Sequence, residues 1–222
     1  MIAGGAEHGK LLAECSRRDF VRRASLLGLG LLVAEALEVA RLMGAPEPAL
    51  AQAGGNDATL QAFADTMIPG RRAATTDLGA AIDPSAIAGV DELPGAVEAD
   101  ALALFHHPEI GFDALEPVFL TELESRSLPL GANFLSLDFG HRVQVALAGL
   151  DFSNSTRVVW EAAAAVPFTA FCAAAINPNQ TAAKASGYRV MGLPGEAPNG
   201  YQRDFSYGRR LSRERTTSGS LP

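Results

Sequence analysis

Three histidines are the side chains in residues 54–222 best suited to bind a metal or move a proton: His106, His107 and His141. Adjacent residues of a helix point about 100° apart, so His106 and His107 cannot share one metal ion without distortion. The carboxylate–histidine repeats of di-iron helical bundles are missing. So are the zinc, nucleophile and dinucleotide motifs that mark common enzyme sites. We therefore expect no catalytic residue, metal or cofactor in this chain. A metal-binding helical enzyme built on the three histidines stays open as an alternative.

Cysteine chemistry receives equally little support. The chain holds two cysteines, and Cys172 is the one that follows the N-terminal segment. It lies within an alanine-rich apolar run, where a buried thiol behaves as a small hydrophobic side chain. We expect Cys172 to be buried and unreactive.

Apolar residues at helical spacing predict an all-α fold with about five helices in one compact domain. The first helix carries Leu60, Phe63, Ala64 and Met67 and ends at Ile68-Pro69-Gly70. Further helices are expected from Pro94 to Phe105, from Phe112 to Leu123 with Pro117 at the true start or a kink, and from Asp138 to Leu150. In the fourth helix we expect Val143, Leu147 and Leu150 to face inward. The fifth runs from Val158 to Ile176, and its uncharged stretch predicts a central, buried helix.

Two stretches of the sequence lack helical periodicity. Residues 70–93 show no periodicity, which indicates a long loop, either in contact with a partner or simply at the surface. Residues 187–208 are rich in glycine, proline and aromatic side chains. These rings are expected to pack against the helices or against another protein.

The N-terminal residues have the layout of an export leader. Ser16, Arg17, Arg18 and Phe20 occupy four positions of the twin-arginine pattern. An apolar stretch, residues 24–34, follows at once, as in a leader, and is too short to span a bilayer. Small residues at Ala51 and Ala53 predict cleavage there. The alternatives are a retained leader, a membrane tether formed by residues 24–43, or an ordinary amphipathic helix with an arginine-rich first turn.

These observations divide the chain into an export signal (1–53), a helical domain (54–208) and a basic tail (209–222). The formal net charge of −7 does not favour nucleic acid as a partner. Twin-arginine export carries folded proteins, often loaded with a cofactor. A leader of this kind on a chain without a cofactor motif predicts an escort: the chain would bind a folded partner and take it across the membrane.

Two segments resemble the gluconate 2-dehydrogenase subunit 3 family. The first is residues 59–70, which end in Ile68-Pro69-Gly70 directly behind the leader. The second contains Gly187-Tyr188, Met191-Gly192-Leu193-Pro194-Gly195 and Asn199-Gly200-Tyr201. The long acidic loop at 70–93 indicates a divergent member, and residues 71–160 match the family in helical character alone.

The resemblance implies a non-catalytic small subunit of a flavin dehydrogenase that oxidises sugars or alcohols. The partner would be a glucose-methanol-choline-type flavoprotein holding FAD, with the twin-arginine translocase and a cytochrome subunit as further partners. The complex would be periplasmic, extracellular or attached to the cell surface. We expect Ile68, Pro69, Tyr188, Met191 and Tyr201 at or near the interface, because tyrosine and methionine are enriched in such contacts.

Overall fold

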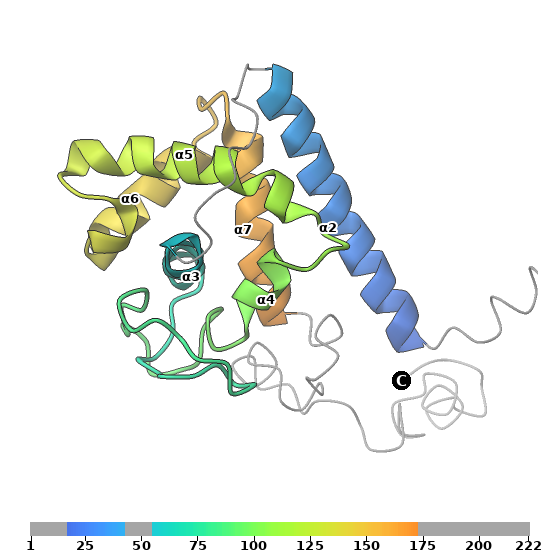
Figure 1. The fold of residues 1–222 in the computed structure, drawn as a ribbon, viewed down its shortest axis with the longest axis horizontal. Coiled ribbons are helices and arrows are strands. Elements are labelled where there is room, and N and C mark those ends of the chain that lie inside the picture. The colour runs from blue at the N-terminus through green and yellow to red at the C-terminus, as the bar shows by residue number, and fades with distance from the viewer. Residues whose placement is uncertain (1–16, 43–54, 173–222) are drawn as a thin grey trace, which may run out of the picture.

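The computed structural model describes residues 17–42 and 55–172. Within these ranges the fold is all-α, as predicted (Figure 1). The α-helices are α2 (Arg17–Leu42), α3 (Gly55–Met67), α4 (Ala101–Phe105), α5 (Glu116–Ser127), α6 (Phe139–Leu150) and α7 (Arg157–Cys172). Three single turns of 3-10 helix join them: η1 (Phe112–Ala114), η2 (Leu128–Leu130) and η3 (Phe134–Ser136). None of the described helices has the length and apolar composition needed to span a lipid bilayer.

An aromatic cluster around Trp160 of α7 forms the centre of the core. Trp160 is fully buried, and its ring meets Phe63 of α3 edge-on at 6.1 Å and Phe119 of α5 at 5.4 Å between centroids. Phe63 and Phe119 are themselves 4.7 Å apart. Edge-to-face pairs at these distances stabilise a core by about 0.5–1.5 kcal/mol each beyond the area that they bury. The cluster therefore locks α3, α5 and α7 together.

Helix α6 reaches this cluster through a glycine. A Cβ atom placed on Gly149 would overlap the indole of Trp160. The close approach explains why α6 turns a different face inward from the one expected. Its buried residues are Arg142, Val145, Ala146 and Gly149, whereas Leu147 is 65% exposed. The prediction that Val143, Leu147 and Leu150 face inward was therefore wrong for Leu147, while Val143 and Leu150 are half-buried.

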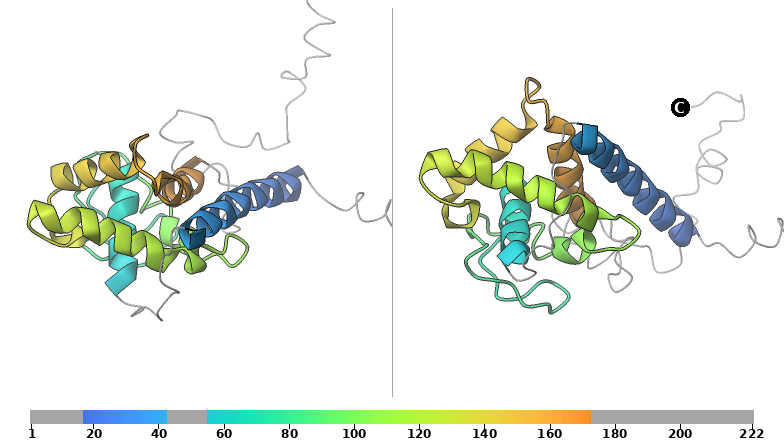
Figure 2. Two further views of the ribbon diagram at one scale, coloured as in Figure 1. Left: turned by 90° about the horizontal axis from the view of Figure 1, so that it is seen from above. Right: turned by 45° about the horizontal axis from the view of Figure 1, so that its top comes forward.

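Helix α2 packs along α7 on the flank of the molecule opposite α6, and the two helices run in opposite directions (Figures 1 and 2). It forms one continuous helix from Arg17 through the apolar stretch of the export pattern to Leu42. One side of it is buried, at alternating spacings of three and four residues that are typical of helix–helix seams. The buried residues are Leu26, Leu29, Val33, Ala36 and Ala40.

Both α3 and α7 are buried at the centre of the fold. Every residue of α3 from Ala58 to Thr66 is buried, so α3 is as central as α7, where burial was expected. Phe168 of α7 is 47% exposed, and Cys172 at its end is also exposed, contrary to the expectation for that thiol. The thiol lies at the last turn, beyond the Trp160 cluster, and this position explains the difference.

The remaining helices match their predicted positions with one exception. Pro117 lies in the first turn of α5, and Asp138 caps α6 by accepting a hydrogen bond from the His141 amide at 2.9 Å. The helix expected from Pro94 begins only at Ala101. Asp100, directly before it, has a left-handed conformation with φ of 64°. That conformation interrupts a helix, so residues 96–100 form turns instead.

The contact between Gly149 and Trp160 yields a prediction about stability. Replacing Gly149 with alanine puts a methyl group into the space of the indole, and we expect a loss of about 1–3 kcal/mol in the free energy of unfolding. Gly28 is the matched control because it lies on the exposed side of α2 and a Cβ there meets no atom within 4 Å. Gly28→Ala should leave stability unchanged or raise it by up to about 1 kcal/mol. Urea denaturation measures both; equal stability of the two variants would contradict the packing described.

Candidate functional site

The Ile68-Pro69-Gly70 turn, which carries part of the family resemblance, lies at a close crossing of two backbone segments. The amide of Ala96 donates to the Ile68 carbonyl at 3.0 Å, and the Arg71 amide donates to the Leu93 carbonyl at 3.1 Å. A Cβ on Gly95 would overlap the Ile68 carbonyl. A side chain at Gly70 would overlap the carboxylate of Glu98. Glycine is therefore required on both sides of the crossing.

Two buried carboxylates flank this crossing. Asp65 of α3 accepts hydrogen bonds from the Ala88 amide at 3.0 Å and from the Gly70 amide at 3.4 Å. Glu98 accepts from the Gly95 amide at 2.8 Å through one oxygen, while its buried Oε1 has no hydrogen-bond partner. Burial raises the pKa of both side chains, and it outweighs the lowering caused by these amides. The pair therefore favours protonation more than exposed carboxyl groups would.

Arg142 of α6 holds the long loop at 70–93 through hydrogen bonds. Its guanidinium donates to the carbonyls of Ala86 at 2.8 Å, Ser85 at 3.1 Å and Leu135 at 2.6 Å. The side chain is only 4% exposed, and burial lowers the pKa of Arg142 in spite of the nearby charge of Asp65. The loop at 70–93 is irregular, as predicted. It is also held to the body by buried polar groups on α3 and α6.

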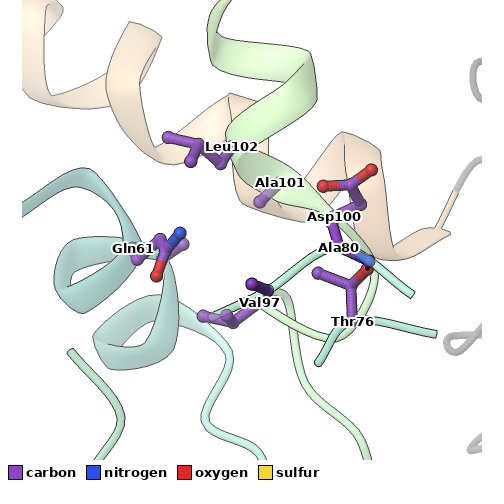
Figure 3. A pocket seen from close by; sticks show the side chains of 9 residues that line it. Gln61, Thr76, Ala80, Val97, Asp100, Ala101 and Leu102 are labelled. Carbon is purple, nitrogen blue, oxygen red and sulfur yellow. Dashed lines mark hydrogen bonds between the residues drawn. The ribbon is translucent and has the colours of Figure 1, made fainter. Parts of the chain in front are cut away.

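A small pocket lies where this loop meets α3 and α4 (Figure 3). Gln61 reaches into it from α3, Thr76 comes from the loop, and Asp100 stands at the start of α4 with a pKa raised by burial. Its volume of about 40 Å³ is enough for roughly two or three water molecules. Pockets for cofactors or substrates are typically about 300–1,000 Å³. This pocket therefore suits hydration of buried polar groups and is too small for a flavin.

His106 bridges two aspartates at the other end of α3. Its Nε2 lies 3.0 Å from Asp57 of α3, and its Nδ1 lies 3.0 Å from Asp113 of η1. Burial alone would lower the pKa of His106, but the hydrogen bonds and charges of Asp113 and Asp57 outweigh it and raise the pKa above the ordinary value of 6.5. When protonated, the His106 imidazolium therefore joins α3, α4 and η1 by two ion pairs.

The histidines do not gather as the metal alternative required. Among the described residues, the group close enough to share an ion is His106, Asp113 and Glu116, without His107 or His141. His141 pairs instead with Asp138 at 2.6 Å, at the start of α6. Each ring nitrogen of His106 already faces a carboxylate. The geometry is that of a bridging ion pair.

The residues predicted to act in export and in binding have different positions. Arg17, Arg18 and Phe20 lie at the start of α2, and Ile68 and Pro69 are half-buried at the crossing. The remaining predicted residues lie outside the described ranges: Ser16, Ala51, Ala53, Tyr188, Met191 and Tyr201.

Sequence analysis missed the buried polar groups. Gln61 and Asp65 stand four residues apart on α3, and this polar pair within a buried helix is the one pattern that could have revealed them. Gln61 accepts a hydrogen bond from the Asp83 amide at 3.1 Å. Nothing in the sequence distinguishes Arg142 from an exposed arginine.

The chain belongs to a protein family of unknown function, DUF5987, whose profile matches residues 55–221. The match begins two residues after Ala53 and therefore leaves out α2. Comparison with curated proteins and with solved structures gave no match.

The role of Arg142 can be tested by deletion of its side chain. Arg142→Ala removes the donor from one buried hydrogen bond, to Ala86, and from two half-buried ones, to Ser85 and Leu135, and we expect it to lower the free energy of unfolding by about 2–4 kcal/mol. Arg41 is the control, because its pair with Glu38 is exposed and such pairs contribute less than about 1 kcal/mol. Chemical denaturation measures the free energy of unfolding of both variants. An equal loss of stability in Arg142→Ala and in the Arg41 variant would show that the loop is not held through Arg142.

The His106 bridge predicts a pH dependence. A histidine whose pKa is raised by folding stabilises the protein fully below its unfolded pKa, and this contribution is lost as pH rises through the folded pKa. The melting temperature of the wild type should therefore fall as pH increases above 6.5, and His106→Gln should remove that part of the slope. His107→Gln, next to the bridge but outside it, should keep the wild-type slope. Thermal melts across this range provide the measurement, and identical slopes for all three proteins would rule out the bridge.

Proposed function

We propose that this protein is a non-catalytic small subunit that escorts a flavin dehydrogenase of the glucose-methanol-choline type through the twin-arginine pathway. The observation that carries the proposal is the twin-arginine pattern Ser16, Arg17, Arg18 and Phe20 on a chain whose motifs indicate no chemistry of its own. The FAD would belong to the partner, which oxidises sugars or alcohols. A cytochrome subunit would complete the complex outside the cytoplasm.

The fold supports this role through the resemblance at Ile68-Pro69-Gly70. The close crossing at Gly70 and Gly95 gives this motif a structural purpose, so it marks a particular backbone arrangement rather than a chance run of residues.

A contact surface for the partner can be proposed next to the motif. Val90 is 54% exposed and Leu93 is 50% exposed, although both are large apolar residues. Backbone hydrogen bonds from Asp91 to Gly70 and from Arg71 to Leu93 hold this part of the loop against the half-buried Ile68 and Pro69. Exposed apolar residues that adjoin one another on an ordered backbone are typical of protein-binding sites. This surface is where the described residues support the predicted contact.

Export of a co-expressed pair tests the proposal. The full chain is produced with a glucose-methanol-choline flavoprotein that lacks a leader, and flavin is measured in the cytoplasmic and exported fractions. Arg17→Lys combined with Arg18→Lys should keep both proteins in the cytoplasm. Arg22→Lys combined with Arg23→Lys changes an equal number of arginines outside the twin-arginine position and should leave export intact.

Two outcomes would contradict the escort role. The flavoprotein could reach the exported fraction without this chain, or the two double variants could behave alike. A further variant, Val90→Asp with Leu93→Asp, separates transport from binding. It should export this chain alone and leave the flavoprotein behind.

A further inference from the structure

The leader helix is an integral part of the packed core in this structure. Leu26, Leu29 and Val33 belong to the apolar stretch of the export pattern, and their side chains are 1%, 5% and 2% exposed. Ala36 and Ala40 continue the same buried side at 0% and 2%. One face of the apolar stretch that an export signal presents to its receptor is therefore covered by the body of the same chain, while Leu27 and Leu31 on the other face are 65% and 63% exposed.

Helix α7 provides the covering surface. A helix turns by about 100° per residue, so Trp160, which faces Phe63 and Phe119, marks one direction around its axis. A second buried stripe lies about 90° away, at spacings of four, three and four residues that match the seam of α2. This stripe consists of Val159, Ala163, Val166 and Ala170, which are 0%, 0%, 0% and 9% exposed.

Helix α2 packs along α7 (Figure 2), and the spacing of its buried residues fits this stripe. The small side chains of the stripe allow a close approach of the two helices. The backbone of α2 also comes close to the segment before η1, because a Cβ on Gly30 would lie 3.0 Å from the Glu109 carbonyl oxygen. The surface is thus shaped for one apolar helix.

We propose that the stripe on α7 is a binding surface for the leader helix and that docking there masks the export signal. Leu26, Leu29 and Val33 cannot pack on α7 and enter the translocase or the membrane at the same time, so the two states exclude each other. In the docked state the buried face of the apolar stretch is not available to the translocase. Release of α2 exposes that face and uncovers the stripe on α7. This inference rests on the proposed export function, because masking has a meaning only if the leader is read.

Variants on α7 test the masking without any change to the leader. Val166→Asp places a charge in the stripe, and Phe168→Asp places the same charge on the opposite, exposed side of α7. Hydrogen exchange of the full chain reports docking through residues 26–40 and the integrity of the body through α3. Val166→Asp should accelerate exchange of residues 26–40 by roughly tenfold or more, while α3 stays protected. Phe168→Asp should change neither.

Export supplies the second measurement. The rate at which Val166→Asp appears outside the cytoplasm should exceed the wild-type rate, and Phe168→Asp should match the wild type. If α3 loses protection in Val166→Asp, the milder Val166→Thr variant, which keeps the shape of the side chain, is judged by the same two measurements.

Three results would overturn the inference. Residues 26–40 of the wild type could exchange as freely as an unfolded chain, the α7 variants could leave their exchange unchanged, or faster exchange could bring no gain in export. Failure of the proposed function looks different: the variant with Arg17→Lys and Arg18→Lys would be exported like the wild type. In that case masking of a signal is ruled out, but exchange would still show whether α2 is docked.

Discussion

The packing of α7 on two sides is the constraint on which the rest of the structure depends. On one side Trp160 fills the space between Phe63 and Phe119, and the absence of a side chain at Gly149 brings α6 against the indole. On the other side small residues receive α2. Because a single helix serves both contacts, the N-terminal helix and the family domain share one hydrophobic core. A change at α7 therefore acts on α2 as well as on the body.

Buried polar groups give the irregular part of the fold its definite shape. A loop of this length has little regular backbone pairing of its own, so its amides and carbonyls need partners elsewhere. Asp65 and Arg142 supply them from α3 and α6. Burying such groups is unfavourable by itself, and the raised pKa of Asp65 reflects that penalty. The hydrogen bonds offset it and hold the loop beside the Ile68-Pro69-Gly70 crossing.

Helix positions followed from the sequence where a local rule governs them. Asp138 as a cap and Pro117 in a first turn depend on neighbouring residues alone. The inward face of α6 depends on the contact between Gly149 and Trp160 of the next helix. The periodicity of apolar residues within α6 cannot predict such a contact. The shortened α4 depends on the left-handed Asp100, and the buried Arg142 on a loop more than fifty residues away. The export pattern and the family resemblance remain predictions, because they concern partners rather than the fold.

The central claim is that this helical chain works as half of a complex whose flavin belongs to the other half. The most direct measurement is purification of the tagged full chain from the exported fraction of its native cells under non-denaturing conditions. The account predicts a stoichiometric second protein and the absorption spectrum of a flavin that leaves with it when the two are separated. Recovery of a colourless protein without a companion, from cells that export it normally, would contradict the account.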